Sequence, residues 1–193
     1  MEVAKIIADG KSNLEGAQFV NGTGSDAPKG IRVALAGGAS EINAAGEALV
    51  ADDVYGLLEA LPPRFRNQAA WQMELSTANF IHRLYNPSGS EPALIEGQNM
   101  LKLPYRLNSS IDPYSDVDDT ATANNYVLTV GDWSKFVILD RVGMSVNFIS
   151  PGHILNTANN LPDGRVGWYA YWRTGSDILT ASAFRMLDVA TTA

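Results

Sequence analysis

The sequence contains no cysteine and only two histidines, His82 and His153. Disulfide bonds, thiolate metal sites and cysteine nucleophiles are therefore excluded, and cysteine usage does not indicate a compartment. With so little imidazole, a metal site would have to consist mainly of carboxylates. No apolar run approaches the ~20 residues that span a bilayer, and the first residues lack the basic and then apolar pattern of a signal peptide. We therefore expect neither a membrane segment nor obvious export.

Basic side chains are scarce in the middle of the chain. The whole sequence has 14 Lys and Arg against 21 Asp and Glu, a net charge of −7. Residues 46–159 hold 7 of the basic and 13 of the acidic residues, whereas the two flanking parts are nearly neutral. An acidic surface repels phosphate backbones, which argues against a dedicated nucleic-acid binder, although such a protein can still enclose nucleic acid without gripping it.

The 193 residues suit one domain, or two lobes that share a core. Apolar spacing predicts helices at residues 2–20, 51–61 and 76–85. Asp52 or Asp53 can cap the second helix, which Pro62 and Pro63 stop, and Ser76 or Thr77 can cap the third.

Strand patterns dominate the rest. Residues 69–75 read as a strand, 32–50 as extended structure and loop, and the second half as antiparallel β structure with Pro104 on an edge strand. Gly131 and Gly143 separate three apolar runs, and Gly175-Ser176 predicts a tight turn. The fold class is α+β.

The stretch NGTGSDAPKGI, residues 21–31, raises the possibility of a phosphate-binding loop. Such a loop needs glycines followed at once by a helix, and the Walker form needs Gly-Lys-Ser/Thr in that order. Here Pro28-Lys29-Gly30 leads into Ile31-Arg32-Val33, which reads as an extended run. We therefore favour a structural turn in which Gly22 or Gly24 has a positive φ.

The aspartates at 112, 116, 118 and 119 alternate in a way that could hold a hard cation. The twelve-residue calcium loop also needs a central glycine and a terminal glutamate, and both are missing. A solvated acidic loop is the simpler interpretation. No GxSxG, HExxH or kinase-like set occurs, so the sequence predicts no enzyme, no cofactor and no metal site.

The densest aromatic cluster is WYAYW, residues 168–172. In a strand, Trp168 and Trp172 share one face while Tyr169 and Tyr171 share the other, so both faces require cover. One face can pack on the protein itself. The other implies a partner subunit, another layer or stacked bases, and the acidic charge makes bases the poorest of these.

Three segments in order resemble major capsid proteins of tailed phages of the Hong Kong 97 type. The first is VYGLLEALPPRFRNQAAWQMELSTANFIHRL, with its Leu-Pro stop, the pair Phe65-Arg66 and a tryptophan strand. The second is VGDWSKFVILDRVGMSV, with Gly131-Asp132-Trp133 and then Asp-Arg-x-Gly-Met. The third is GRVGWYAYWRTGSDILTASAFRML, and the loop ending Pro-Lys-Gly-Ile is also similar. The resemblance covers nearly all of the chain.

This resemblance implies a Hong Kong 97-type capsid fold with two lobes. Residues 1–45 and 160–193 would form a peripheral lobe, with the end of the family's long spine helix and the C-terminal strands. Residues 46–159 would form an axial lobe with a mainly antiparallel sheet. The family's N-terminal arm, extended loop and crosslinking lysine have no counterpart in this sequence, so the chain reads as a core fragment.

The resemblance further implies a structural subunit, without catalysis, that forms hexamers and pentamers of an icosahedral shell around double-stranded DNA. Its partners would be copies of itself, together with portal and scaffold proteins in the particle. It would be assembled in the host bacterial cytoplasm and located in the virion. Candidate interface residues are Arg64, Arg66, Trp168, Trp172 and Arg173. The alternatives are an encapsulin-like compartment shell and, from another class, a small carboxylate-based metal-dependent hydrolase.

Overall fold

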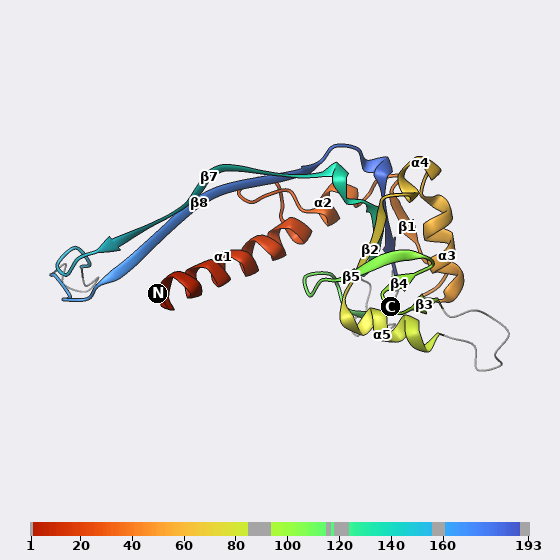
Figure 1. The fold of residues 1–193 in the computed structure, drawn as a ribbon, viewed down its shortest axis with the longest axis horizontal. Helices are drawn as coiled ribbons and strands as arrows, with labels where there is room; N and C mark the ends of the chain where they lie inside the picture. The colour runs from red at the N-terminus through yellow and green to blue at the C-terminus, as the bar shows by residue number, and fades with distance from the viewer. Residues whose placement is uncertain (1, 85–93, 115–116, 118–123, 156–160, 190–193) are drawn as a thin grey trace.

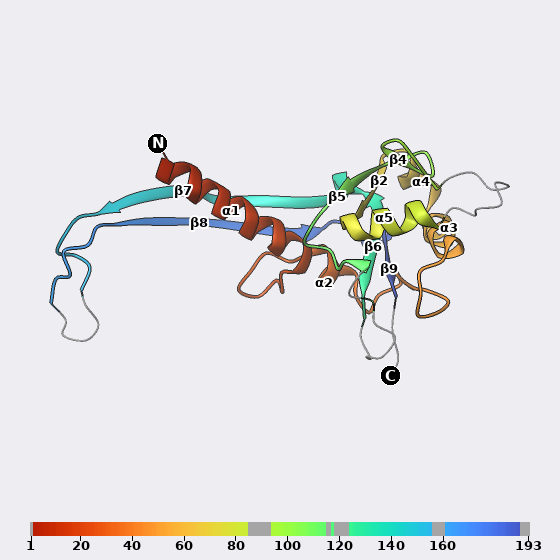
Figure 2. The same ribbon diagram turned by 90° about the horizontal axis from the view of Figure 1, so that it is seen from below.

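The computed structural model describes residues 2–84, 94–114, 117, 124–155 and 161–189. The molecule is elongated, with a mixed α/β head at one end and a long two-stranded arm at the other (Figure 1). The arm consists of β7 (Phe136–Ile149) and β8 (Gly167–Ile178). Helix α1 (Glu2–Asn21) runs beside the arm in both views (Figures 1 and 2).

A seven-stranded sheet forms the head, in the order β1-β9-β6-β2-β5-β4-β3. The strands are β1 (Glu41–Asn43), β2 (Ala69–Met73), β3 (Ile95–Glu96), β4 (Asn99–Met100), β5 (Leu103–Leu107), β6 (Tyr126–Asp132) and β9 (Phe184–Asp188). Pairing is parallel for β1 with β9 and for β2 with β5, and antiparallel for the other neighbours. The mostly antiparallel sheet with helices confirms the predicted α+β class.

Three helices lie against this sheet: α3 (Ala51–Ala60), α4 (Pro63–Arg66) and α5 (Leu75–Arg83). Trp71 on β2 is fully buried, and its indole N–H donates to the carbonyl of Met100 at 2.9 Å. Every residue of β6 is buried, because helices or neighbouring strands cover both of its faces. Burial of this central strand places the core in the head.

Two local predictions for the head are wrong. Strand β5, which contains Pro104, lies between β2 and β4 and is not an edge strand. Its pairing with β2 begins only at Tyr105, so the missing N–H of Pro104 interrupts no bond on that side. Helix α5 is capped by Glu74, whose carboxylate accepts a hydrogen bond from the backbone N–H of Ser76, and not by Ser76 or Thr77.

The arm is one continuous ribbon, which corrects two further predictions. Gly175 and Ser176 lie inside β8 and pair with β7, so the expected tight turn is absent. Gly143 lies inside β7 and does not divide it. The register shifts twice, between Asp140 and Val142 and between Val142 and Ser145, which places extra residues on β7 alone. Bulges of this kind increase the local twist of a ribbon.

The glycine-rich loop folds back on the end of α1, as predicted. Gly24 has a φ of 79°, and a side chain at Gly22 would collide with the carbonyl oxygen of Pro28. The run that follows is the short helix α2 (Ile31–Leu35), not an extended segment. Four of its five residues are apolar, so its composition alone did not separate a buried helical turn from a strand.

The boundaries of the two lobes remain a prediction. Paired strands connect segments that were placed in different lobes. β7 and β8 pair along their length although residue 159 was placed between two lobes. β1 and β9 join the same sheet as β2 and β6. Two short 3-10 turns, Trp133–Lys135 and Ala181–Ala183, connect the head to the arm.

Candidate subunit interface

Exposed apolar side chains gather on the arm. Of the 20 large hydrophobic residues exposed in the described part of the chain, 12 lie between Ile138 and Leu179, eight of them on β7 or β8. They include Leu139 at 67% exposure and Tyr169 at 56%. An isolated two-stranded ribbon is marginally stable in water, and clusters of exposed apolar side chains mark interaction surfaces. The arm is therefore the candidate interface.

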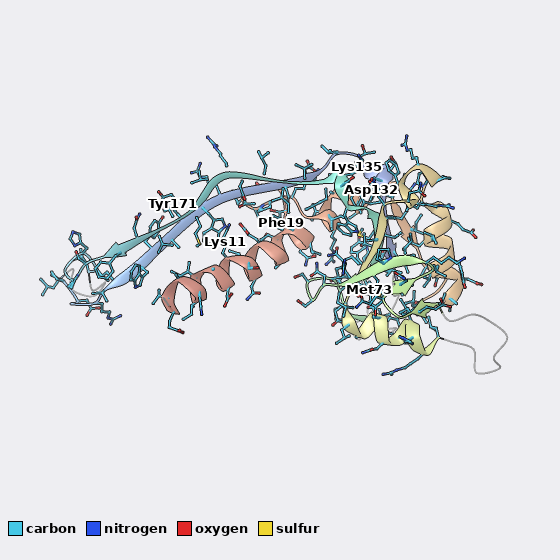
Figure 3. All side chains as sticks on the ribbon, in the orientation of Figure 1. Lys11, Phe19, Met73, Asp132, Lys135 and Tyr171 are labelled. Atoms are coloured by element: carbon cyan, nitrogen blue, oxygen red, sulfur yellow. The ribbon has the colours of Figure 1, made fainter. Side chains whose placement is uncertain are left out.

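One face of the arm is covered near its base by α1. Phe19 of α1 meets Phe136 of β7 edge to face, with ring centres 6.3 Å apart, and Figure 3 labels Phe19 on the side of α1 that faces the arm. The hydroxyl of Thr174 hydrogen-bonds Glu15 Oε1 and Asp140 Oδ1, each at 2.8 Å. These contacts hold the helix against the ribbon.

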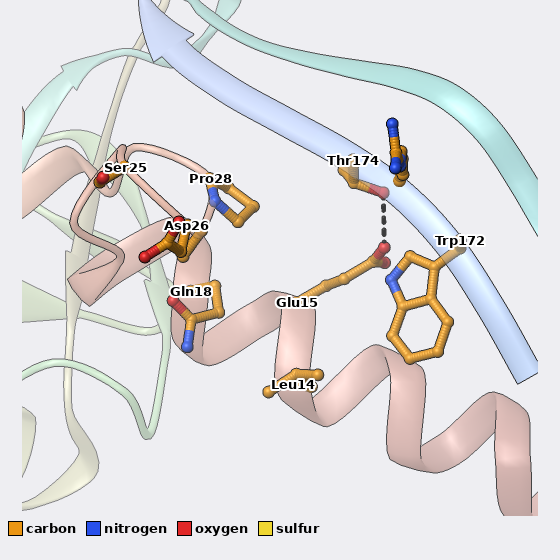
Figure 4. A pocket seen from close by; sticks show the side chains of 10 residues that line it. Leu14, Glu15, Gln18, Ser25, Asp26, Pro28, Trp172 and Thr174 are labelled. Atoms are coloured by element: carbon orange, nitrogen blue, oxygen red, sulfur yellow. Dashed lines mark hydrogen bonds between the residues drawn. The ribbon is translucent and has the colours of Figure 1, made fainter.

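A cleft of about 610 Å³ lies between α1 and β8. Leu14, Gln18 and Trp172 line it, and Figure 4 shows the Trp172 indole between strand and helix. Glu15 also borders the cleft and pairs with Lys11 at 3.4 Å. The half-buried Trp172 therefore lies on the face of β8 that α1 covers.

The opposite face of the arm is open. Alternation along β8 places Tyr169, Tyr171 and Arg173 on this face, although Arg173 also borders the cleft. All three residues are exposed, and the rings of Tyr169 and Tyr171 are 5.8 Å apart. Farther out on the covered side, Trp168 is 53% exposed and packs only on Phe148, at 5.2 Å, among the ring contacts of the described residues.

The two candidate arginines of the head lie far from the arm residues and differ from each other. Arg64 is exposed, lies over the ring of Phe65 and reaches Ser182 Oγ at 3.3 Å. Arg66 is half-buried and donates to the carbonyls of Leu61 and Glu59, at 2.8 and 2.9 Å. Arg66 therefore closes the C-terminal end of α3, and the five candidate residues do not form one site.

Arg185 completes this helix end, a role that the sequence did not indicate. Its guanidinium donates to the carbonyl of Ala60 at 3.0 Å and to Ser40 Oγ at 3.1 Å. Burial lowers the pKa of Arg185 from its ordinary value. Together Arg66 and Arg185 supply donors to three consecutive carbonyls at the end of α3, which fixes that helix on the sheet.

A polar joint links α1 and α2 to the head. Arg32 pairs with Asp112 at 3.0 Å and stacks over the ring of Tyr126, 4.7 Å from its centre. The other oxygen of Asp112 accepts from the backbone N–H of Tyr126. Behind it, Asp188 is 2% exposed and accepts from the backbone N–H of Asn125 at 2.7 Å. Burial raises the pKa of Asp188 from its ordinary value.

The acidic loop contributes one aspartate to this joint. The carboxylate of Asp112 is engaged by Arg32, whereas Asp116, Asp118 and Asp119 lie outside the described residues. Within the described ranges, no group of three His, Asp or Glu side chains could hold a metal ion. No helix in the described part of the chain is long and apolar enough to cross a membrane.

The glycine-rich loop, residues 21–31, contacts strand β8 of the arm. Lys29 pairs with Asp177 of β8 at 3.2 Å, its backbone N–H donates to the carbonyl of Ser176, and its carbonyl accepts from Ser176 Oγ. The loop therefore fastens the end of α1 to the arm. The expected extended run after Gly30 is instead helix α2, but the residue order of the loop does not match a Walker loop.

This combination of head, helix and long arm is the Hong Kong 97-type capsid fold. The capsid of an empty GTA particle matches with a TM-score of 0.74 at 22% identity, over 98% of this chain and 65% of that chain. An encapsulin complex, SrpI from Synechococcus elongatus PCC 7942, matches at 0.64 and 13%, over 97% and 64%. Mycobacterium phage Ogopogo matches at 0.62 and 14%, over 97% and 68%.

The sequence model of the phage capsid family matches residues 1–189, and the chain belongs to this family. A search of curated proteins found no match. The chain spans about 65% of the length of the GTA capsid chains.

Proposed function

We propose that this protein is a structural subunit of an icosahedral phage or prophage capsid. It assembles into hexamers and pentamers that tile a shell around double-stranded DNA. The observation that carries the proposal is the arm: a ribbon with apolar side chains exposed on both faces, in a member of the phage capsid family. Copies of the chain are its main partners, and catalysis plays no part.

The charge of the chain supports a shell that encloses DNA without gripping it. The net charge of −7 repels phosphate backbones. It also makes like-charged heads repel one another, so contacts between copies need local pairs of opposite charge and should depend on salt. In the particle, portal and scaffold proteins are further partners, and assembly takes place in the host bacterial cytoplasm.

An encapsulin-like compartment shell is the second candidate. Similarity to the SrpI encapsulin over 97% of this chain favours it. The genes beside this one discriminate between the two: terminase, portal and protease genes indicate a phage, and a gene for a cargo enzyme indicates a compartment.

Electron microscopy and sedimentation test the proposal. The protein extended with any coding sequence upstream of residue 1 should form closed shells or capsomers, and association should change between 50 mM and 500 mM NaCl. Failure to form ordered assemblies at any salt concentration would refute the shell function. Calorimetric titration with calcium, magnesium and manganese tests the third candidate, a carboxylate-based hydrolase. Tight binding of a metal ion in a fixed ratio to protein would favour that candidate.

A further inference from the structure

Helix α3 presents an acidic face on the side of the head farthest from the arm (Figure 1). Asp52, Tyr55, Gly56 and Glu59 are exposed, and spacings of three, four and seven residues place them on one side of the helix. The helix contains no basic residue. The side chains of Asp52 and Glu59 have no hydrogen-bonding or ionic partner among the described residues, so both charges are available to another chain.

Gly56 in the middle of this face has no explanation within one copy. A glycine in an exposed helix interior destabilises the helix relative to alanine. Its φ is not positive, and a Cβ added there would meet nothing within 4 Å. The absence of a side chain does allow another helix to approach the backbone of α3 closely, with Tyr55 beside the contact.

Helix α5 presents the complementary surface along a different edge of the head (Figures 1 and 2). Its exposed residues are Leu75, Asn79, His82 and Arg83, and the helix contains no acidic residue. Arg83 has no hydrogen-bonding or ionic partner in the described part of the chain. Leu75 is 53% exposed and offers an apolar surface on which a ring such as that of Tyr55 can pack. The two helices therefore differ in charge and both carry exposed apolar area.

The spacings of the two faces match when the helices lie antiparallel. Asp52 and Gly56 are four residues apart, about 6 Å along α3, and Asn79 and Arg83 are the same distance apart along α5. Asp52 can therefore meet Arg83 while Gly56 meets Asn79. The antiparallel orientation also brings the positive N-terminal end of α3 to the negative C-terminal end of α5.

These two faces can meet only between copies, because they lie on different edges of the same head (Figures 1 and 2). A contact between two different surfaces of one chain is heterologous. Repetition of such a contact closes into a ring or continues as an open filament, whereas a contact of one surface with itself would stop at a dimer.

We propose that α3 of one copy packs antiparallel against α5 of the next copy, with Asp52 beside Arg83 and Gly56 against Asn79. The inference rests on the proposed function, because it names the two surfaces through which neighbouring heads meet when copies form a ring. The occupant is a second copy of this chain, chosen by the complementary charges of the two helices and by their matching residue spacing.

A substitution that separates folding from association tests the close approach. Gly56→Ala should raise Tm by about 2–4 °C, because alanine favours the helix. It should nevertheless weaken association about tenfold, because the new methyl group holds the partner helix away. Gly10→Ala in α1, an exposed helical position equally free of neighbours, is the matched control and should raise Tm without weakening association. Sedimentation velocity measures association, and thermal unfolding measures Tm.

Charge exchange tests the pairing of Asp52 with Arg83. Each of Asp52→Lys and Arg83→Glu should weaken association about tenfold, because attraction between the two side chains becomes repulsion. The double variant with both changes in one chain should associate as the wild type does, because the pair is restored with its signs exchanged. Arg106→Glu is the control, since it removes the same charge from an exposed position on β5 and should leave association unchanged.

A disulfide crosslink tests the register directly, because the chain has no cysteine of its own. Proteins carrying Gly56→Cys and Asn79→Cys, mixed under mild oxidation, should form an interchain disulfide, which requires Cα atoms within about 7 Å of each other. Arg106→Cys in place of Asn79→Cys should not form it. Mass spectrometry of the linked peptides identifies the two partners.

The outcomes separate the two levels of the argument. If the wild-type protein never associates, both the shell function and the helix contact are overturned. If it associates, and Gly56→Ala, Asp52→Lys and Arg83→Glu all associate as the wild type does, the contact is wrong while the shell function stands. Weakened association in the single charge variants without recovery in the double variant also overturns the pairing. Recovery in the double variant together with the Gly56–Asn79 crosslink supports the contact.

Discussion

Arg66 and Arg64 are two arginines on one short helix that should differ sharply in their effect on stability. Replacing Arg66 by alanine removes donors from the carbonyls of Leu61 and Glu59. Leu61 is fully buried, so water does not readily replace the charged donor of its carbonyl. Loss of this hydrogen bond should lower the free energy of unfolding by about 1.5 kcal/mol. Glu59 is exposed and water can replace its donor, which together with the helix dipole adds about 0.5 kcal/mol.

The sum is about 2 kcal/mol, which corresponds to a decrease in Tm of about 4–8 °C for a chain of this size. Arg64→Ala removes an exposed ring contact and one long hydrogen bond, so a change below about 0.5 kcal/mol is expected. Arg66→Lys should fall between them, because lysine keeps the charge but lacks the planar fork that reaches two carbonyls.

Differential scanning calorimetry of the three variants, under conditions where all remain monomeric, measures these shifts. Urea unfolding supplies the free energies independently. If Arg66→Ala and Arg64→Ala melt within 1 °C of each other, the role assigned to Arg66 at the end of α3 is wrong. Arg66 would then have to be reconsidered as an interface residue.

The remaining predictions concern the core, the joint and α1. Gly131→Ala should destabilise the protein by about 3 kcal/mol or prevent folding, because the new Cβ would lie 2.3 Å from the ring of Phe184; urea unfolding measures this. Burial raises the pKa of Asp188 in the folded state. Ionisation of Asp188 therefore destabilises the folded protein, and this destabilisation is absent below the pKa of the unfolded chain, about 4, and complete above the pKa of the folded state. Asp188→Asn should therefore gain stability relative to the wild type as pH rises from 4 to 8, and a constant difference would contradict this. Removing the hydroxyl of Thr174 with Thr174→Val should cost the α1 contact about 1 kcal/mol, seen as about fivefold faster amide exchange in α1 with β6 unchanged.

The sequence predicted those helices and loops that are determined by residues close together in the chain. Helix α3 has an apolar stripe, acidic residues in its first turn and Pro62-Pro63 after it, and the structure ends the helix at Ala60. The N-cap residue is Val50 and neither expected aspartate occupies that position, although Asp53, the third residue of the helix, accepts a hydrogen bond from the backbone N–H of Val50. The loop at 21–31 was recognised as structural from its residue order, which the contacts of Lys29 agree with.

Elements decided by distant partners could not be predicted in the same way. Gly175-Ser176 has the composition of a turn, yet it stays extended because Leu139 and Ile138 pair with it from a segment far away in the sequence. Arg66 reaches the end of α3 only because the chain folds back after Pro63. Arg185 reaches it only because β9 lies beside α3 in the folded protein. The alternating faces of WYAYW were predictable from strand period alone, but which face α1 covers was not.

Strand β9 has a consequence for the time at which the subunit becomes able to assemble. It lies between β1 and β6, and Met186 is paired with Glu41 on one side and Thr129 on the other. Until the ribosome has synthesised β9, two strands of the sheet lack a neighbour and Arg185 is not there to hold the end of α3. The arm is translated before that strand, because β7 and β8 precede β9 in the sequence. A nascent chain therefore has a complete head only after its arm has been synthesised.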